Sequence, residues 1–279
     1  MLPTHTVVPR GERIVSDASS VIDDLSRESE ELDRLVAELE ESRWALATPA
    51  PGWTVAHQIA HLAWTDRAAL LAVTDAEAFG TEVGKALASP GTWVDEAARV
   101  GAALPPARLL STWREGRAAL DRALRAAPSG TRFPWYGPPM SVASMATGRL
   151  METWAHGQDV ADTLGVTRAP ADRLRHVVRI GVRARDFAFG VRGLSAPPEE
   201  FRVELVAPSG KDVWTYGPED ATQRVTGLAL DFCLLVTQRA NRADLAVRAE
   251  GPDADQWLDI AQAFAGPPGV GRAPKGEGR

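Results

Sequence analysis

Two stretches of the sequence decide the fold: TVAHQIAHLAWTDRAALL, residues 54–71, and RLMETWAHGQDVADTLG, residues 149–165. Each has the apolar spacing of a helix, and each carries two side chains of metal-binding type four positions apart. These pairs are His57 with His61, and Glu152 with His156. Residues four apart lie on one face of a helix, so each pair can direct both side chains to a single point.

Further helices are predicted on both sides of the first stretch. Residues 17–47 form one long segment with apolar residues at helical spacing, and the Pro-Ala-Pro-Gly sequence that follows ends it. Thr54 suits the N-cap of the next helix. After a more broken region, a third helix is expected from about residue 105 and a fourth over about 141–164. Four such helices predict a bundle, whose interior is a usual place for metal ligands from facing helices.

The second half of the chain has a different character. A helix over about 171–189 is followed by two strand-like segments around a Ser-Gly turn, and then by alternating short strands and helices. This mixture predicts an α+β domain. We therefore expect an α+β protein overall, with a four-helix bundle over residues 1–167 and a smaller α+β domain over residues 168–279. The Gly- and Pro-rich tail from residue 266 is expected to be loosely ordered.

The composition limits which binding partners and which cellular location are expected for this protein. The net charge of −6 argues against a nucleic-acid or anionic-membrane partner, since either favours a basic surface. No apolar run approaches membrane-spanning length and no signal peptide is evident, so a cytoplasmic protein is expected. The single cysteine, Cys233, excludes an intrachain disulfide and suits a small buried hydrophobe. His5 lies in a Pro-containing start, and no role is expected for it.

The two helical pairs predict a metal site if their faces meet inside the bundle. Imidazole nitrogen and carboxylate oxygen are good ligands for zinc and other divalent first-row metals. A site with three protein ligands keeps a coordination position open for water or substrate, which is typical of a catalytic centre. The residues alone leave another interpretation open, because a Glu/His pair at this spacing is often a surface hydrogen bond and a lone histidine is often a satisfied core group.

The residues PGWTVAHQIAHLAWTD (51–66), followed far downstream by RLMETWAHGQDVADTLG, resemble the mycothiol-dependent maleylpyruvate isomerase family of DinB-like four-helix bundles. Residues 231–272 resemble the C-terminal domain of a subgroup labelled by wyosine base formation. The resemblance implies a metal held by His61, Glu152 and His156. It also implies zinc as the usual ion, with nickel or iron as alternatives, and mycothiol as a thiol co-substrate.

Neighbouring residues have more than one interpretation. A fourth ligand would close a tetrahedral ion, so His57 is assigned with Arg149 to the catalytic pocket instead. Arg149 could bind a substrate carboxylate or pair with Glu152. Asp159 could orient the ring of His156 or be solvated. Trp64 suits the core better than a platform for the substrate.

The predicted function is that of a metal-dependent enzyme that activates a thiol, by resemblance mycothiol, for isomerisation or S-transfer on a small electrophilic substrate. A thiol-independent metalloenzyme of specialised metabolism, a hydrolase or a cyclase, is the first alternative. A non-catalytic metal- or ligand-binding protein is the second. The identity of the substrate and the formation of a homodimer are not decided by the sequence.

Overall fold

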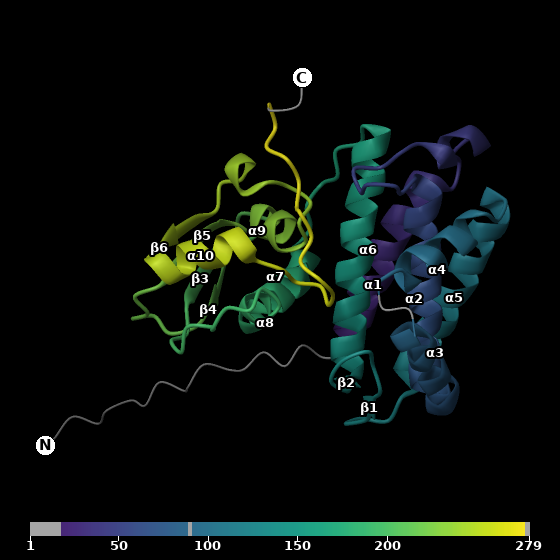
Figure 1. Cartoon of the computed structure of the whole chain (residues 1–279), viewed down its shortest axis with the longest axis horizontal. Helices are drawn as coiled ribbons and strands as arrows, with labels where there is room; N and C mark the ends of the chain where they lie inside the picture. The colour runs from purple at the N-terminus through teal and green to yellow at the C-terminus, as the bar shows by residue number, and fades with distance from the viewer. Residues whose placement is uncertain (1–17, 89–90, 277–279) are drawn as a thin grey trace, which may run out of the picture.

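The computed structural model describes residues 18–88 and 91–276, and His5 lies outside them. It has a helical part and a smaller part with a sheet, side by side (Figure 1). The main helices of the first part are α1 (Ala18–Val36), α2 (Val55–Thr74), α5 (Pro106–Ala126) and α6 (Val142–Leu164). Helix α2 packs against both α5 and α6, and α1 packs against α6. The predicted four-helix bundle and the α+β fold class are confirmed.

Local signals define the two helices that carry the metal-binding pairs. Helix α2 begins after Thr54, whose backbone N–H donates to His57 Nδ1 at 3.3 Å. Helix α6 begins after Ser141, whose hydroxyl accepts from the backbone N–H of Ser144 at 3.2 Å. It ends at Gly165, which has the left-handed φ of 70° that favours glycine at a helix C-terminus. Helix α6 therefore starts and stops where its sequence predicts, and α2 starts directly after its predicted N-cap.

Smaller elements complete the helical part. They are the short helix η1 (Glu41–Ala45), helices α3 (Ala76–Ala88) and α4 (Trp93–Ala102), and the hairpin of β1 (Arg132–Phe133) and β2 (Met140–Ser141). The single helix predicted over 17–47 is wrong, because α1 stops at Val36. The chain turns there, and Trp44 of η1 is buried in a cluster with Val36 and Ile59. Burial of a large aromatic side chain thus outweighs the local helical pattern.

The second part is built on a sheet with the strand order β4-β3-β5-β6. Its strands are β3 (Arg202–Val206), β4 (Val213–Tyr216), β5 (Arg224–Leu228) and β6 (Arg248–Glu250). The predicted β3–β4 hairpin is antiparallel, whereas β3 and β5 pair in parallel. Helix α9 (Ala229–Val236) packs on β3 and β5, and α10 (Pro252–Ile260) packs on β6. The helix predicted over 171–189 is divided into η2 (Asp172–Leu174), α7 (Arg175–Arg183) and α8 (Arg185–Gly190).

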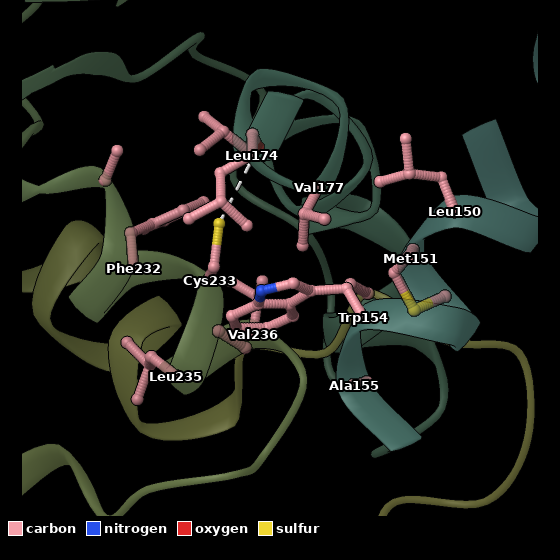
Figure 2. Packing of buried hydrophobic residues seen from close by; sticks show 14 of the residues in the cluster. Leu150, Met151, Trp154, Ala155, Leu174, Val177, Phe232, Cys233, Leu235 and Val236 are labelled. Carbon is pink, nitrogen blue, oxygen red and sulfur yellow. Dashed lines mark hydrogen bonds between the residues drawn. The ribbon is translucent and has the colours of Figure 1, made fainter. Parts of the chain in front are cut away.

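The two parts share one hydrophobic core. Figure 2 shows Leu150, Met151 and Trp154 of α6 packed toward side chains of α7 and α9, and all belong to one cluster of buried residues. The division of the chain after residue 167 stays a prediction, since this core is continuous across it. No helix in the described residues is long and apolar enough to cross a membrane.

Buried ion pairs also join the two parts. Glu28 of α1 is 1% exposed and pairs with Arg168 and Arg173, which follow the end of α6. Asp159 of α6 is fully buried and pairs with Arg239 at 3.0 Å and with Arg272 at 2.5 Å. Arg272 lies in the tail that was expected to be loosely ordered. That expectation is wrong for residues 266–276, because the tail lies along α6 and is anchored there (Figure 1).

Glu28→Gln should destabilise the protein by roughly 3 kcal/mol, because it removes the buried carboxylate of Arg168 and Arg173 and leaves them the partly exposed carboxylate of Glu31. Glu30→Gln on the same helix is the matched control. Glu30 forms its ion pair in the described residues with Arg34 on the surface, and such pairs contribute about 0.5 kcal/mol or less. Urea unfolding of both variants and the parent measures the difference. Equal midpoints for the two variants would contradict the role given to Glu28.

Candidate metal centre

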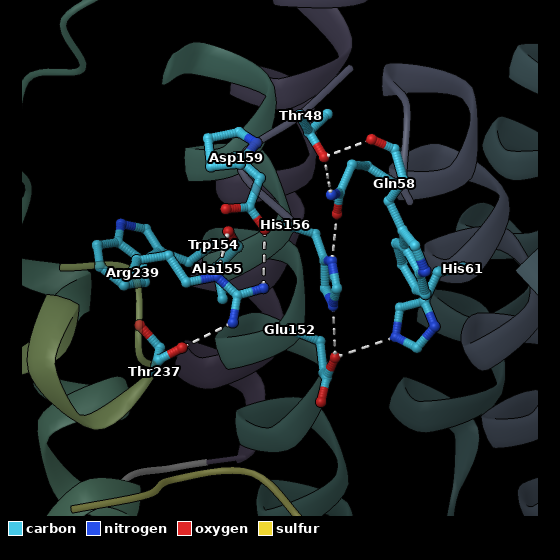
Figure 3. Close-up of polar contacts among 12 residues, drawn as sticks. Thr48, Gln58, His61, Glu152, Trp154, Ala155, His156, Asp159, Thr237 and Arg239 are labelled. Atoms are coloured by element: carbon cyan, nitrogen blue, oxygen red, sulfur yellow. Dashed lines mark hydrogen bonds and ion pairs between the residues drawn. The ribbon is translucent and has the colours of Figure 1, made fainter. Parts of the chain in front are cut away.

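His61, Glu152 and His156 meet between α2 and α6. One ligand atom from each residue lies within 4.8 Å of the other two. The Nε2 atoms of His61 and His156 are each 3.2 Å from Glu152 Oε2, as Figure 3 shows. The two imidazole rings lie 4.4 Å apart between centroids. The packing of two helices thus brings together side chains that are 91 residues apart in sequence.

The hydrogen bonds of His156 determine which of its nitrogens faces Glu152. Gln58 Nε2 donates to Thr48 Oγ1 at 2.9 Å, so Gln58 Oε1 is an acceptor. This oxygen lies 2.5 Å from His156 Nδ1, which therefore carries the ring proton and donates it. Burial, and next the neighbouring His61, lower the pKa of His156 to about 3, so the ring is neutral. Its Nε2 then holds a lone pair directed at Glu152.

The charge of Glu152 completes the site. Burial alone would raise its pKa, whereas the hydrogen bond from His61 Nε2 at 3.2 Å lowers it. A carboxylate oxygen and an imidazole lone pair therefore face each other at 3.2 Å. Two acceptor atoms repel at that distance unless a cation lies between them. In addition, His61 Nδ1 is buried and finds no partner among the described residues. This donor set fits zinc or another divalent first-row metal.

Gln58 is the residue that the sequence analysis missed. It is fully buried, and it orients His156 in place of Asp159. Both interpretations offered for Asp159 are wrong, because its face of α6 meets the second part of the chain, where Arg239 and Arg272 neutralise it. The position of Gln58 three residues before His61, on the same face of α2, could have indicated that it lies near the metal group.

His57 and Arg149, the other two predicted site residues, lie in different parts of the helical bundle. His57 Nδ1 lies 2.8 Å from Thr54 Oγ1 at the start of α2, outside the three-residue group. Burial lowers the pKa of His57. Arg149 is 2% exposed, and its Nε donates to Asp66 Oδ1 at 2.9 Å, so its carboxylate partner is Asp66 and not Glu152. The catalytic roles of His57 and Arg149 stay predictions.

A cavity of about 850 Å³ adjoins the three-residue group. His61, Glu152 and Arg149 line it from the helical part, whereas the second part contributes side chains of α7 and the segment after α10. Trp64 lines it as well, so this ring faces the cavity and is not simply part of the core. His57 is not among the lining residues. A cavity of this size between two parts of a chain is a usual place for a small-molecule site.

Comparisons with known proteins agree with this geometry. Residues 25–161 match the family described as the mycothiol maleylpyruvate isomerase N-terminal domain, and residues 197–250 match the family described as wyosine base formation. The chain belongs to the mycothiol-dependent maleylpyruvate isomerase family. The N-terminal match contains all three residues of the group.

Relatives and solved structures extend the match beyond the N-terminal region. Uncharacterized proteins MT0041 and Rv0036c of two Mycobacterium tuberculosis strains, CDC 1551 / Oshkosh and H37Rv, are each 57% identical over 258 residues. Those matches cover 92% of this chain and 100% of each relative. Crystal structures of the mycothiol-dependent maleylpyruvate isomerase and of its histidine-to-alanine mutant match with a TM-score of 0.59 and 16% identity. They cover 85% of this chain and 95% of the isomerase, so this family member shares the isomerase fold.

After incubation with zinc, His61→Ala should retain much less metal than the parent, because it removes one of the three candidate ligands. His57→Ala is the matched control on the same helix and should keep about one ion per chain. Metal content after dialysis, measured by inductively coupled plasma mass spectrometry, tests both variants. If the His57 variant loses its metal and the His61 variant keeps it, the ligand assignment is wrong.

Gln58→Leu should weaken zinc binding about 10- to 100-fold, the usual effect of removing the partner that orients a metal-bound histidine. Gln58→Glu keeps an acceptor for His156 Nδ1 and should restore most of the affinity. Competition with a chromophoric chelator measures the affinity. Gln158→Leu on α6 is the control, since the side chain of Gln158 donates to Asp162 at the surface, away from the three-residue group. Equal affinity in the parent and in Gln58→Leu would contradict the orienting role.

Proposed function

We propose that this chain is a divalent-metal enzyme that activates an external thiol, mycothiol, for isomerisation or S-transfer on a small electrophilic substrate. The proposal includes zinc as the ion and the cytoplasm as the location. The observation that carries it is the convergence of His61, Glu152 and His156 beside the cavity, which His61 and Glu152 line. A group of three ligands that opens onto a cavity leaves room for a further ligand, as catalytic zinc sites do.

His61, Glu152 and His156 would hold the ion. Two neutral imidazoles and one carboxylate leave a divalent ion with a net positive charge, which suits an anionic further ligand such as a thiolate. When bound, the metal would lower the pKa of a coordinated thiol and so supply a nucleophile at neutral pH. Gln58 would fix the tautomer of His156 that this donor set requires.

The thiol is assigned to an external molecule because the chain offers none at the site. Cys233 is the only cysteine in the sequence, and it is fully buried in α9 of the other part. Burial raises its pKa well above the ordinary value, and its Sγ donates weakly to the carbonyl oxygen of Leu174 at 3.7 Å. A buried neutral thiol of this kind is unreactive. The nucleophile must therefore enter through the cavity.

The same site accommodates two outcomes. Addition of the thiolate to a conjugated double bond, rotation and expulsion of the thiolate give cis–trans isomerisation. Displacement of a leaving group, which departs with the bonding electron pair, gives S-transfer. Both place negative charge on the electrophile, and Arg149 lines the cavity where that charge would be stabilised. The family match favours isomerisation of the substrate.

Addition of mycothiol should raise the melting temperature of the zinc-loaded protein by about 5 °C at a hundredfold excess over the dissociation constant. His61→Ala should show no shift, whereas His57→Ala should respond like the parent. Scanning calorimetry with and without the thiol measures the effect. A substrate that is turned over by protein showing no thiol binding would favour the thiol-independent alternative instead.

A further inference from the structure

One wall of the cavity is a continuous row of aromatic rings that begins at the metal group. His61 lies 5.7 Å from Trp64, which meets Trp93 edge-on at 4.3 Å. Trp93 in turn lies 5.2 Å from Tyr136, and Tyr136 lies 5.1 Å from Trp135. These rings come from α2, from the start of α4 and from the β1–β2 hairpin. Three separate segments therefore converge to build one aromatic surface.

The position of these rings indicates a binding surface and not only a core. Trp64, Trp93, Trp135 and Tyr136 are all half-buried, and all four line the cavity. Phe79 of α3 is 1% exposed and supports them from behind, stacked on Trp135 at 5.7 Å. Aromatic faces attract flat apolar groups in offset or edge-on arrangements. The wall therefore suits a planar part of a ligand.

The charged residues of the cavity are mostly cationic. Its lining contains four arginines and a single acidic residue: Arg132, Arg149, Arg179, Arg183 and Glu152. Glu152 is already assigned to the metal and Arg149 is paired with Asp66, so the remaining positive charge of the lining comes from Arg132, Arg179 and Arg183. The whole chain has a net charge of −6, which makes this local excess the opposite of the average surface. A cavity lined by one sign of charge concentrates ligands of the opposite sign.

Two hydrogen-bond donors of the lining have no partner in the described residues. Arg149 is 2% exposed, and its Nε donates to Asp66. Its Nη2 is buried and has no hydrogen-bond partner among the described residues. Tyr136 Oη is also buried without one. Burial, and next the Glu82 carboxylate, raise the pKa of Tyr136 to about 12, so this hydroxyl stays protonated. A buried donor without a partner costs free energy, which an acceptor group on a ligand would restore.

We propose that the electrophilic substrate of this site is a planar aromatic carboxylate that carries its conjugated double bond or its leaving group outside the aromatic ring. Its rings lie along Trp64, Trp93 and Tyr136, and its carboxylate faces the arginines of the lining, Arg149 foremost. The volume of about 850 Å³ accommodates two fused rings beside a thiol, since drug-sized molecules occupy cavities of roughly 300–1,000 Å³. The assignment as a substrate rests on the proposed function, whereas the binding preference does not require turnover.

Isothermal titration of the zinc-loaded full chain with three probes tests the preference. The probes are 2-naphthoate, the neutral 2-naphthalenemethanol and the saturated cyclohexanecarboxylate. We expect 2-naphthoate to bind at least tenfold more tightly than either of the others, because only it satisfies both the rings and the arginines. Equal affinity for all three probes would overturn the proposal.

Variants locate the bound probe. Trp93→Leu should weaken 2-naphthoate binding at least fivefold, whereas Trp214→Leu should not, because Trp214 is a half-buried tryptophan of β4 outside the cavity. Arg183→Gln should reduce the preference for 2-naphthoate over the neutral probe, with the exposed Arg192→Gln as its control. Equal effects of the two tryptophan changes would place the probe elsewhere and refute the assignment.

The same samples separate this proposal from the proposed function. Protein that binds zinc and mycothiol but shows no preference for 2-naphthoate contradicts only the substrate class. Protein that prefers 2-naphthoate but binds neither zinc nor mycothiol contradicts only the proposed chemistry. In that case the cavity is a binding site for aromatic anions.

Discussion

One contact governs the candidate metal centre: the lone pair of His156 Nε2 faces Glu152 Oε2 at 3.2 Å, an arrangement that is unfavourable without a cation between the two atoms. Gln58 produces this arrangement, because its side-chain oxygen accepts a hydrogen bond from His156 Nδ1, which carries the only proton of the neutral ring. The helices α2 and α6 must pack closely for His61 to reach the same oxygen. The bundle therefore concentrates acceptor atoms at one point, and a divalent ion would turn their repulsion into binding.

The second part of the chain completes what the bundle cannot supply alone. It covers the apolar face of α6 with α7 and α9, and it neutralises the buried Asp159 through Arg239 and Arg272. Asp159 lies one turn beyond His156, so α6 carries the metal-ligand candidates and, one turn further along, the ion pairs that hold the second part. The cavity lies where the two parts meet, which allows α7 to add Arg179 and Arg183 to its lining.

The sequence predicted the parts of this arrangement that depend on local spacing. Periodicity predicted the faces of α2 and α6 and the α+β class of the second half. The family resemblance predicted the grouping of His61 with Glu152 and His156. The sequence did not predict the role of Gln58, the partners of Asp159 or the aromatic wall of the cavity. Each depends on which faces meet after folding, and no periodicity within a segment encodes that. The break after Val36 was missed for a similar reason, since the burial of Trp44 is a tertiary effect.

X-ray absorption at the zinc edge tests the central claim most directly. Without thiol, the zinc-loaded protein should show only nitrogen and oxygen neighbours, at about 2.0–2.2 Å. Addition of mycothiol should introduce one sulfur neighbour at about 2.3 Å, the usual zinc–sulfur distance. A sulfur neighbour before the thiol is added, or none at saturating thiol, would contradict the account of a three-ligand metal centre that receives an external thiol.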